Sequence, residues 1–229
     1  MTPRRVVLPA LLALLAPGLV AAAEPEYAAT RTAATKAALL GTEEPAWAAA
    51  QRVAWGPAAY ETAFRAAWNE DGLFLRFDAL DPQPWHTMTR RDDHLWEEEV
   101  VEIFLAAGEA DPVDYFELEV SPLGVLLDAR VHNPTSRREE MSVDLAWDCP
   151  GIEWRAEARP HEERWWAEIA VPWSSIAEGA SPPRVVRANL FRIDRPREGA
   201  AEFSCWSPTF TDPPDFHKPA RFGFLGIER

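Results

Sequence analysis

Three glutamates stand at positions where the sequence predicts buried β-strands. Glu102 interrupts the apolar run Val100–Leu105, whose β-branched and aromatic residues are typical of a strand buried on both faces. Glu117 and Glu119 alternate with apolar residues from Tyr115 to Val120. An ionised carboxylate inside such a strand is costly unless it is paired or hydrogen-bonded. Glu102 therefore either has an Arg partner or faces a cleft that takes a ligand.

Two kinds of chemistry suit carboxylates in this pattern. Carboxylates bind sugar hydroxyls through strong charge-assisted hydrogen bonds, and the apolar face of a pyranose stacks on Trp. Trp96 lies on the same strand face as Glu102 if the extended conformation begins at Trp96, and Trp206 would supply a second aromatic wall. Alternatively, Glu102 with Glu117 or Glu119 would form the carboxylate pair of a glycosidase if neighbouring strands align them.

Structural roles for the same acids stay open. Arg76, Arg130 and Arg187 are the candidates for a buried ion pair with Glu102. The two glutamates of the next strand would simply point to solvent if their sheet has one exposed face.

Other catalytic and metal-binding patterns are absent from the sequence. It has no nucleophile elbow, zinc-protease, P-loop or dinucleotide-binding motif. Its five His lack ligand spacing, and we expect His217 to make a structural hydrogen bond. We expect no cofactor; the acidic loops leave calcium open, although no EF-hand spacing indicates a particular site.

The N-terminus has the layout of a secretory signal peptide. Arg4 and Arg5 precede an apolar run and the small residues Ala21 to Ala23, which predicts cleavage after residue 23 and a mature chain of residues 24–229. The apolar run is too short for a comfortable membrane span, and no later segment is longer. We therefore expect a periplasmic or secreted protein.

The mature chain is strongly acidic. Loss of Arg4 and Arg5 takes the net charge from −14 to about −16, which argues against nucleic acid or an anionic membrane as a partner. The two cysteines, Cys149 and Cys205, both follow the cleavage site. An oxidising compartment permits a disulfide between them, and the sequence leaves that bridge open.

Short strands separated by turns account for most of the chain. Thr62–Trp68 and Leu73–Ala79 flank a turn at residues 69–72 and predict a hairpin. Tyr27 to Leu40 is expected to be a short helix or an irregular lead-in, and Pro172 to Ile176 a single helical turn. About ten strands without sustained helical periodicity predict an all-β fold, a β-sandwich or jelly roll, in one domain.

Several segments in a fixed order resemble carbohydrate-binding module family 9 and its relatives. They are Trp96–Leu105, Tyr115–Gly124, Trp166–Trp173, Arg187–Arg192, Trp206–Pro208 and Phe216–Gly223. The resemblance extends from about Trp47 to Leu225. It implies a β-sandwich in which two Trp clamp a terminal sugar and a Glu after the first Trp bonds its hydroxyls. Trp96 and Glu102 match the first part of that motif, and Trp206 is the candidate for the second wall.

The sequence thus predicts an exported domain that binds a carbohydrate without catalysis. Trp96 and Trp206 would stack on the sugar, and Glu102 with Glu117 or Glu119 would bond its hydroxyls. A glycan-processing enzyme that uses these carboxylates is the alternative. The resemblance also implies a third, lower-ranked possibility, because related domains bind b-type haem through Met and Lys. The residues available for haem are Lys36, Lys218, Met88 and Met141.

Overall fold

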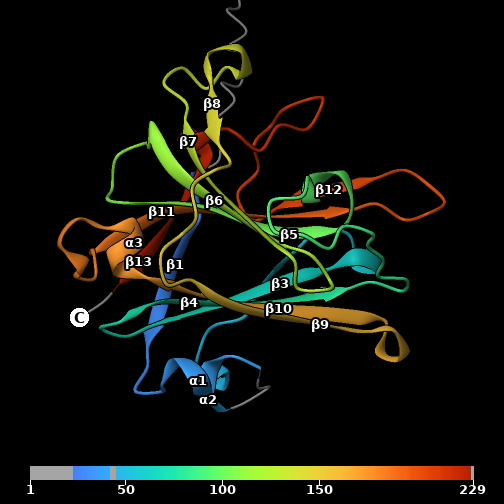
Figure 1. The fold of residues 1–229 in the computed structure, drawn as a ribbon, viewed down its shortest axis with the longest axis horizontal. Coiled ribbons are helices and arrows are strands. Elements are labelled where there is room, and N and C mark those ends of the chain that lie inside the picture. Colours follow the sequence, from blue (N-terminus) through green and yellow to red (C-terminus); the bar gives the residue numbers. More distant parts are fainter. Residues whose placement is uncertain (1–22, 42–44, 228–229) are drawn as a thin grey trace, which may run out of the picture.

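The computed structural model describes residues 23–41 and 45–227, so all but the last residue of the predicted signal peptide lies outside the described residues. Within these ranges thirteen strands form one curled sheet that folds into two packed layers (Figure 1). The strands are β1 (Glu26–Arg31), β2 (Val53–Trp55), β3 (Thr62–Trp68), β4 (Gly72–Leu80), β5 (Val100–Ala107), β6 (Asp114–Val120), β7 (Leu126–His132), β8 (Ser142–Asp144), β9 (Glu153–Arg159), β10 (Arg164–Pro172), β11 (Val185–Asp194), β12 (Glu202–Cys205) and β13 (Gly223–Ile227).

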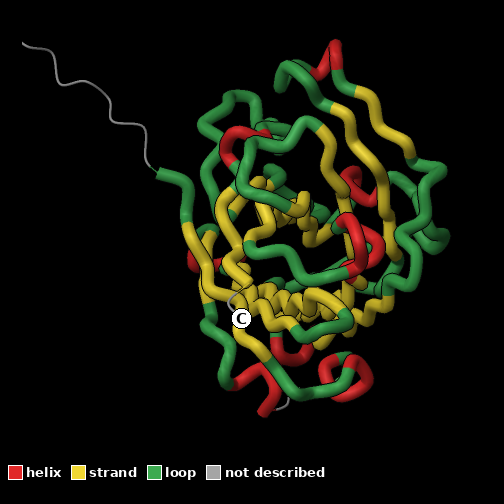
Figure 2. Tube along the Cα trace, turned by 90° about the vertical axis from the view of Figure 1, so that its left-hand side faces the viewer, coloured by secondary structure: helices red, strands yellow, loops and turns green. Residues whose placement is uncertain are grey.

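Helical segments within the described residues are single turns. The α-helical turns are α1 (Lys36–Leu39), α2 (Pro45–Ala48) and α3 (Trp173–Ile176). The 3₁₀ turns are η1 (Ala58–Tyr60), η2 (Leu95–Glu97), η3 (Arg138–Glu140), η4 (Pro160–Glu162), η5 (Glu178–Ala180) and η6 (Pro219–Arg221). Figure 2 shows these turns among loops around the strands. None of the helices in the described part of the chain has the length and apolar character needed to cross a bilayer.

The strand order divides the sheet into two layers joined by β1. The β5 layer has the order β8-β7-β6-β5-β11-β13, with β12 beside β11, and the β4 layer has the order β3-β4-β10-β9, with β2 beside β3. The first part of β1 pairs in parallel with β13, and its last residues, Thr30 and Arg31, pair in parallel with β3. One strand therefore passes from one layer to the other, which confirms the sandwich that the sequence predicts.

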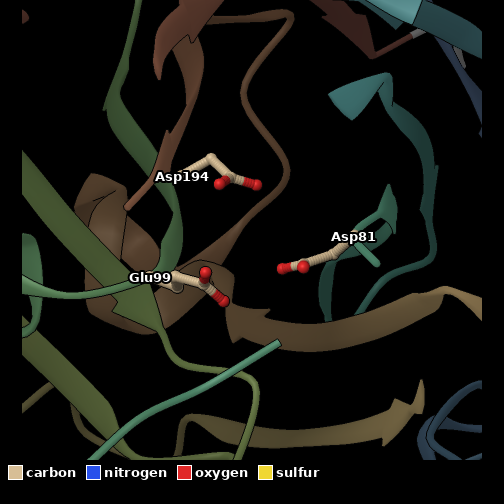
Figure 3. A group of neighbouring side chains, drawn as sticks. All are labelled: Asp81, Glu99 and Asp194. Carbon is tan, nitrogen blue, oxygen red and sulfur yellow. The ribbon is translucent and has the colours of Figure 1, made fainter. Parts of the chain in front are cut away.

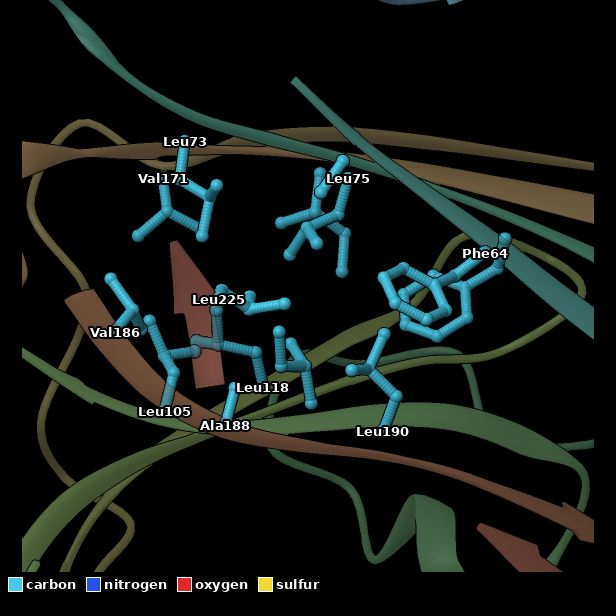
Figure 4. Close-up of a cluster of buried hydrophobic side chains, with 14 of the residues drawn as sticks. Phe64, Leu73, Leu75, Leu105, Leu118, Val171, Val186, Ala188, Leu190 and Leu225 are labelled. Atoms are coloured by element: carbon cyan, nitrogen blue, oxygen red, sulfur yellow. The ribbon is translucent and has the colours of Figure 1, made fainter. Parts of the chain in front are cut away.

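The main core fills the space between the layers. Leu75 of β4 and Val171 of β10 face Leu105 of β5 and Leu190 of β11, and all four side chains are fully buried (Figure 4). Burial of each such side chain stabilises the fold by roughly 1.5–3 kcal/mol relative to exposure. Because side chains alternate along a strand, the neighbours of these residues on β5 and β11 point away from the main core.

The predicted local elements are largely present. β3 and β4 form the expected antiparallel hairpin. The Oδ1 atom of Asn69 accepts the backbone N–H groups of Asp71 (2.8 Å) and Gly72 (3.3 Å), which shapes its turn. η4 joins β9 to β10, and α3 begins directly after Pro172 as expected.

The N-terminal lead-in differs from the expectation of a short helix or irregular segment. It begins with β1, in which Tyr27 and Ala29 are buried in the main core, and only then forms α1. Six residues rich in Ala and Thr carry little strand signal of their own. β1 pairs with β13, at the C-terminal end of the described chain, and with β3, which begins at Thr62. Its extended conformation therefore depends on pairing with distant segments, which the local sequence does not reveal.

α1 and α2 cover the outer face of the β4 layer below the sheet in Figure 1. Thr35 caps α1 because its side-chain oxygen accepts the backbone N–H of Ala38. Leu39 and Trp47 pack against Phe74 of β4 and Ala170 of β10. These contacts bury an outer face of the sheet that would otherwise expose aromatic side chains.

The two cysteines are both free. Cys149 is buried in the main core, whereas Cys205 packs on the opposite face of the β5 layer. A layer of sheet thus lies between their environments, and the bridge that the sequence left open is not formed.

Arg192 lies among three buried acidic side chains. Asp81, Glu99 and Asp194 point their carboxyl groups toward one another (Figure 3), and each residue is at most 2% exposed. Arg192 Nη2 donates to Asp81 Oδ2 (2.8 Å) and to Asp194 Oδ2 (2.7 Å). Burial and the nearby Asp81 carboxylate raise the pKa of Glu99 to about 9. Arg192 therefore ties the end of β4 to β11, while Glu99 keeps its proton at neutral pH.

Trp206, directly after β12, reaches into the main core. Its ring makes an edge contact with Phe64 at a centroid distance of 5.4 Å. A Cβ atom on Gly223 would lie 2.6 Å from the Trp206 ring and 2.6 Å from the Pro25 carbonyl oxygen. Only a glycine lets β13 approach the ring so closely.

We predict that Gly223→Ala lowers the free energy of unfolding by about 1–3 kcal/mol, because the added methyl overpacks the core against backbone and ring atoms. The matched control is Gly226→Ala on the same strand, where a Cβ atom would meet only the Tyr27 carbonyl oxygen at 3.8 Å. Urea unfolding of both variants measures the difference. Equal stability of the two variants would contradict the placement of Trp206 under β13.

We predict that Glu99→Gln flattens the loss of stability that accompanies a rise in pH from about 4.5 to about 9. A carboxyl group whose pKa is about 9 in the folded chain and near 4.5 when unfolded stabilises the fold less as pH rises between these values. The wild type should therefore lose up to about 1.4 kcal/mol more per pH unit than the variant over this window. Thermal unfolding from pH 5 to pH 9 tests this, with the exposed Glu97→Gln as the charge-matched control. Parallel curves for wild type and Glu99→Gln would refute it.

Candidate functional site

The outward face of the β5 layer carries a second cluster of buried apolar side chains, here called the outer core. Its members are Leu95, Val100, Phe104, Ala106, Tyr115, Val125, Leu127, Ala129, Val131, Phe191, Ile193, Phe216 and Phe222. Half-buried side chains such as Trp96 and Phe203 pack against it. The β5 layer is therefore covered on both faces, as the apolar run around Glu102 indicates.

Strand pairing brings the three predicted glutamates together on this outward face. Glu102 of β5 stands directly opposite Glu119 of β6, and Glu117 stands opposite Phe104, two residues further along β5. One carboxylate oxygen from each glutamate lies within 4.8 Å of the others. Glu102 is 2% exposed, Glu117 6% and Glu119 0%. This group is called the glutamate triad below.

The glutamate triad forms part of the wall of a cavity of about 360 Å³. This volume lies in the range of small-molecule sites, roughly 300–1,000 Å³. The residues that line it are Trp96, Glu102, Phe104, Glu117, Glu119, Arg138, Met141, Val143, Leu145, Ile193, Arg195, Phe203, Pro214, Phe216 and His217. Acidic, basic and aromatic side chains thus meet in one hollow.

Trp96 reaches the cavity from the turn η2 rather than from the strand. β5 begins at Val100, so the expected continuous alternation from Trp96 to Glu102 is not present. Trp96 stacks on His94 with ring centroids 4.5 Å apart and an interplanar angle of 19°. Arg195 Nε donates to the Trp96 carbonyl oxygen at 3.2 Å, which helps hold the turn beside the cavity.

The predicted second wall, Trp206, is not part of the cavity. It is 9% exposed and packs into the main core on the opposite face of the β5 layer. Alternation explains the difference, because Phe203 and Cys205 of β12 pack on the outer core while Trp206 follows on the other side. Phe203, one of the cavity residues, is the aromatic side chain that this segment supplies.

The Arg partners considered for Glu102 are all engaged elsewhere. Arg76 bonds to Asp78 and Glu168 on the β4 layer. Arg187 donates to the Phe222 carbonyl oxygen and pairs with Asp111. Arg130 lies over the rings of Phe116 and Trp147. Glu102 therefore faces the cavity rather than a buried guanidinium.

Burial controls the protonation of the glutamate triad. It raises the pKa of Glu102 and of Glu119 well above their ordinary values, and the neighbouring carboxylates raise them further. Burial also raises the pKa of Glu117 to about 7. Near neutral pH the ligand-free triad therefore holds protons, so its carboxyl groups can both donate to and accept from hydroxyl groups.

Two arginines line the cavity without bonding to the triad. Arg138 Nε donates to Asp215 Oδ1 at 3.1 Å, and Arg195 lies over the Phe203 ring with its Cζ atom 5.1 Å from the centroid. Their positive charges partly offset the rise in the pKa of Glu102. Neither arginine was selected from the sequence, since each lies in a polar loop with many equally plausible neighbours.

His217 has a structural role, as expected. Its Nδ1 atom lies 2.8 Å from the Tyr115 hydroxyl, and its ring stacks on Phe104 with centroids 4.8 Å apart. Burial lowers the pKa of His217 to about 4, so the ring is neutral at physiological pH. It fixes the segment that carries Phe216 against the outer core.

Three groups of acids among the described residues have the spacing of cation ligands. They are Asp81 with Glu99 and Asp194, Asp92 with Asp128 and Asp148, and the glutamate triad. Arg192 bonds to two members of the first group, and Arg91 to two members of the second. In these two groups a guanidinium already supplies the positive charge.

The residues considered for haem are separated. Met141 lines the cavity, whereas Met88 lies outside its lining. Lys36 pairs with Glu153, and Lys218 Nζ donates to the Ser136 carbonyl oxygen at 2.8 Å. No Met–Lys pair meets in this cavity within the ranges that the structure describes.

Comparison with known proteins gives one family and several structural neighbours. The sequence model of carbohydrate-binding family 9 matches residues 34–227. An extracellular protein from Arthroderma benhamiae is 28% identical over 145 residues, which are 60% of this chain and 65% of that protein. The chain thus spans slightly less than two thirds of this relative.

Solved structures share the fold. A presumed carbohydrate-binding protein from Bacteroides uniformis superposes with a TM-score of 0.67 and 16% identity, over 90% of this chain and 100% of that one. A family 9 carbohydrate-binding module from Caldicellulosiruptor kristjanssonii, solved with cellotriose, gives a TM-score of 0.61 and 11% identity over 89% and 94% of the two chains. The complex of such a module from the same organism with glucose superposes with a TM-score of 0.60 and 11% identity, over 89% of this chain and 96% of that one. At these identities the likeness concerns the fold alone.

Proposed function

The chain belongs to carbohydrate-binding family 9, and on that premise we propose that it binds a carbohydrate in the cavity between Trp96 and the glutamate triad, without catalysing a reaction. One observation carries the proposal. A half-buried Trp stands beside buried carboxyl groups that no Arg or Lys among the described residues engages. An apolar ring next to unpartnered hydrogen-bonding groups is complementary to a sugar, which has apolar faces and a polar edge.

Each part of the cavity has a distinct role in this proposal. Trp96 stacks on one face of the sugar ring, and Phe203 supplies an apolar surface elsewhere in the cavity. Glu102 and Glu119 exchange hydrogen bonds with hydroxyl groups. Arg138 and Arg195 contribute N–H donors that strengthen when they meet an ionised or polarised oxygen.

The arrangement of the carboxyl groups favours binding over hydrolysis. A glycosidase places its two carboxyl groups on either side of the scissile bond. The glutamate triad instead lies side by side on two adjacent strands of one sheet face. From there all three carboxyl groups approach a ligand from the same side.

The proposed setting is outside the cytoplasm. The layout of residues 1–23 and the name of the A. benhamiae relative, an extracellular protein, support export.

We predict that Trp96→Ala weakens binding of glucose or cellotriose at least about tenfold, because the ring contributes stacking worth on the order of 1.4 kcal/mol or more. Isothermal titration calorimetry measures the affinity. Trp154→Ala is the control, since Trp154 is also half-buried but lies on β9 of the other layer. Trp206→Phe should lower thermal stability and leave the affinity of the folded protein unchanged. Undiminished binding by Trp96→Ala would refute the proposed site.

We predict that prolonged incubation with cello-oligosaccharides releases no shorter products, because the carboxyl groups do not flank a bond. Chromatography of the mixture checks this. Product release that disappears in Glu102→Gln and Glu119→Gln would replace the binding proposal with the glycosidase alternative.

We predict that the mature protein begins at Glu24 after secretion, because Ala21 to Ala23 provide small residues at the cleavage site. N-terminal sequencing of protein from a periplasmic extract or culture medium tests this. Recovery of the unprocessed chain in the cytoplasmic fraction alone would exclude export.

A further inference from the structure

The glutamate triad differs from the other two acidic groups in how its charge is balanced. In the group of Asp92, Asp128 and Asp148, Arg91 Nη2 lies 2.7 Å from Asp128 Oδ2 and Arg91 Nε lies 2.8 Å from Asp148 Oδ1. Arg192 serves the group of Asp81, Glu99 and Asp194 in the same way. No Arg or Lys of the described residues forms an ion pair with the triad. Arg138 and Arg195 line the same cavity but form no ion pair with the triad, so the space against its oxygens is open to a cation.

The buried carboxyl groups of the triad are poorly supplied with donors. Glu102 is 98% buried, and its Oε1 atom has no hydrogen-bond partner. Glu119 is fully buried, and the Glu117 carboxyl group and the Trp96 backbone N–H, which interact with it, make no well-formed hydrogen bond to its oxygens. Buried polar atoms in native proteins are nearly always satisfied, so the Glu102 and Glu119 oxygens point to a bound group. They lie in the wall of an open cavity, which gives that group a route of entry.

The spacing and type of these ligands select a hard cation. Oxygens that share a calcium ion at 2.3–2.6 Å lie at most about 5 Å apart, and the triad oxygens lie within 4.8 Å of one another. The donor set is oxygen only. His217 also lines the cavity, but its Nδ1 atom is engaged with the Tyr115 hydroxyl. Softer metals that prefer nitrogen or sulfur are disfavoured by such a set.

We propose that Glu102, Glu117 and Glu119 together bind one calcium-class divalent cation in the wall of the cavity, and that hydroxyl groups of the bound sugar complete its coordination. The second part rests on the proposed function, whereas the cation site stands without it. Calcium takes six to eight oxygens, and three carboxylates supply three to six. The remaining positions face the cavity, where a pair of adjacent sugar hydroxyls or water fills them.

The competing explanation is that the triad balances its charge with shared protons alone. Protonated carboxyl groups would bond to one another and need no metal. The two explanations differ in whether an added cation binds stoichiometrically and stabilises the fold, since a ligand that binds only the folded state raises the unfolding temperature.

The first experiment measures the cation alone. Purified mature protein is treated with EDTA, dialysed, and titrated with CaCl₂ or MgCl₂ by calorimetry and by thermal unfolding. We expect one Ca²⁺ per chain, a raised unfolding temperature, and weaker binding of Mg²⁺, which demands near-ideal octahedral geometry. Glu119→Gln should weaken Ca²⁺ binding at least about tenfold, because it removes a charged ligand.

The matched control removes an acid from another group. Asp148→Asn changes the net charge by the same amount as Glu119→Gln. The Asp148 side chain is 69% exposed and lies outside the triad, so Ca²⁺ binding should be unchanged. Glu119→Gln keeps the shape of the side chain and removes like-charge repulsion, so we expect it to fold. Its unfolding temperature without metal verifies this. Absence of saturable Ca²⁺ binding by the wild type, or equal binding by wild type and Glu119→Gln, would overturn the cation site.

The second experiment separates the cation from the sugar. Glucose and cellotriose are titrated into protein with Ca²⁺ and with excess EDTA, and we expect at least about tenfold weaker binding in EDTA. Equal sugar affinity in both conditions would overturn the coordination of sugar by the cation and leave the proposed function intact. Saturable Ca²⁺ binding without binding of either sugar would support the cation site and count against these sugars as ligands.

Discussion

Burial of the β5 layer on both of its faces is the constraint on which the fold and the candidate site depend. Successive side chains of a strand point to opposite faces of the sheet, so the odd- and even-numbered residues of β5 lie in different environments. Val101, Ile103 and Leu105 complete the main core, while Glu102 and Phe104 face the outer core and the cavity. A shift of register by one residue would put the Glu102 carboxylate between the layers and turn Val101, Ile103 and Leu105 toward the outer core and the cavity.

The negative charge of buried carboxylates is compensated in two ways in this domain. Where a group serves only the fold, as at Asp81 and Asp194, the Arg192 guanidinium of β11 meets both carboxylates at about 2.8 Å. The glutamate triad has no such partner. Its pKa values are raised, so its carboxyl groups keep protons and carry less negative charge. Such an arrangement costs stability. A ligand that supplies donors or positive charge recovers that cost, which links the electrostatics of the cavity to binding.

The local backbone structure decides which aromatic side chains reach the cavity. Trp96 reaches the cavity from a turn, although β5 begins four residues later than a continuous strand from Trp96 would require. Phe203 and Trp206 lie three residues apart on one segment and therefore face opposite ways. Side-chain type alone favoured the larger ring of Trp206 as a sugar-stacking residue. The parity of β12 assigns that face to Phe203.

Local sequence determined much of this protein. The hairpin at Asn69, the turn after Pro172 and the apolar strands follow from residue type and period, and the ordered motifs indicate the family. Glu102, Glu117 and Glu119 were recognisable because an acid in an apolar strand is costly wherever the strand lies. Tertiary structure decided the strand character of β1, the separation of the cysteines, the face of Trp206, and the approach of Arg138 and Arg195. Each of these depends on pairing or packing between segments far apart in the chain, and alternation along one strand carries no information about which distant strand will cover which face.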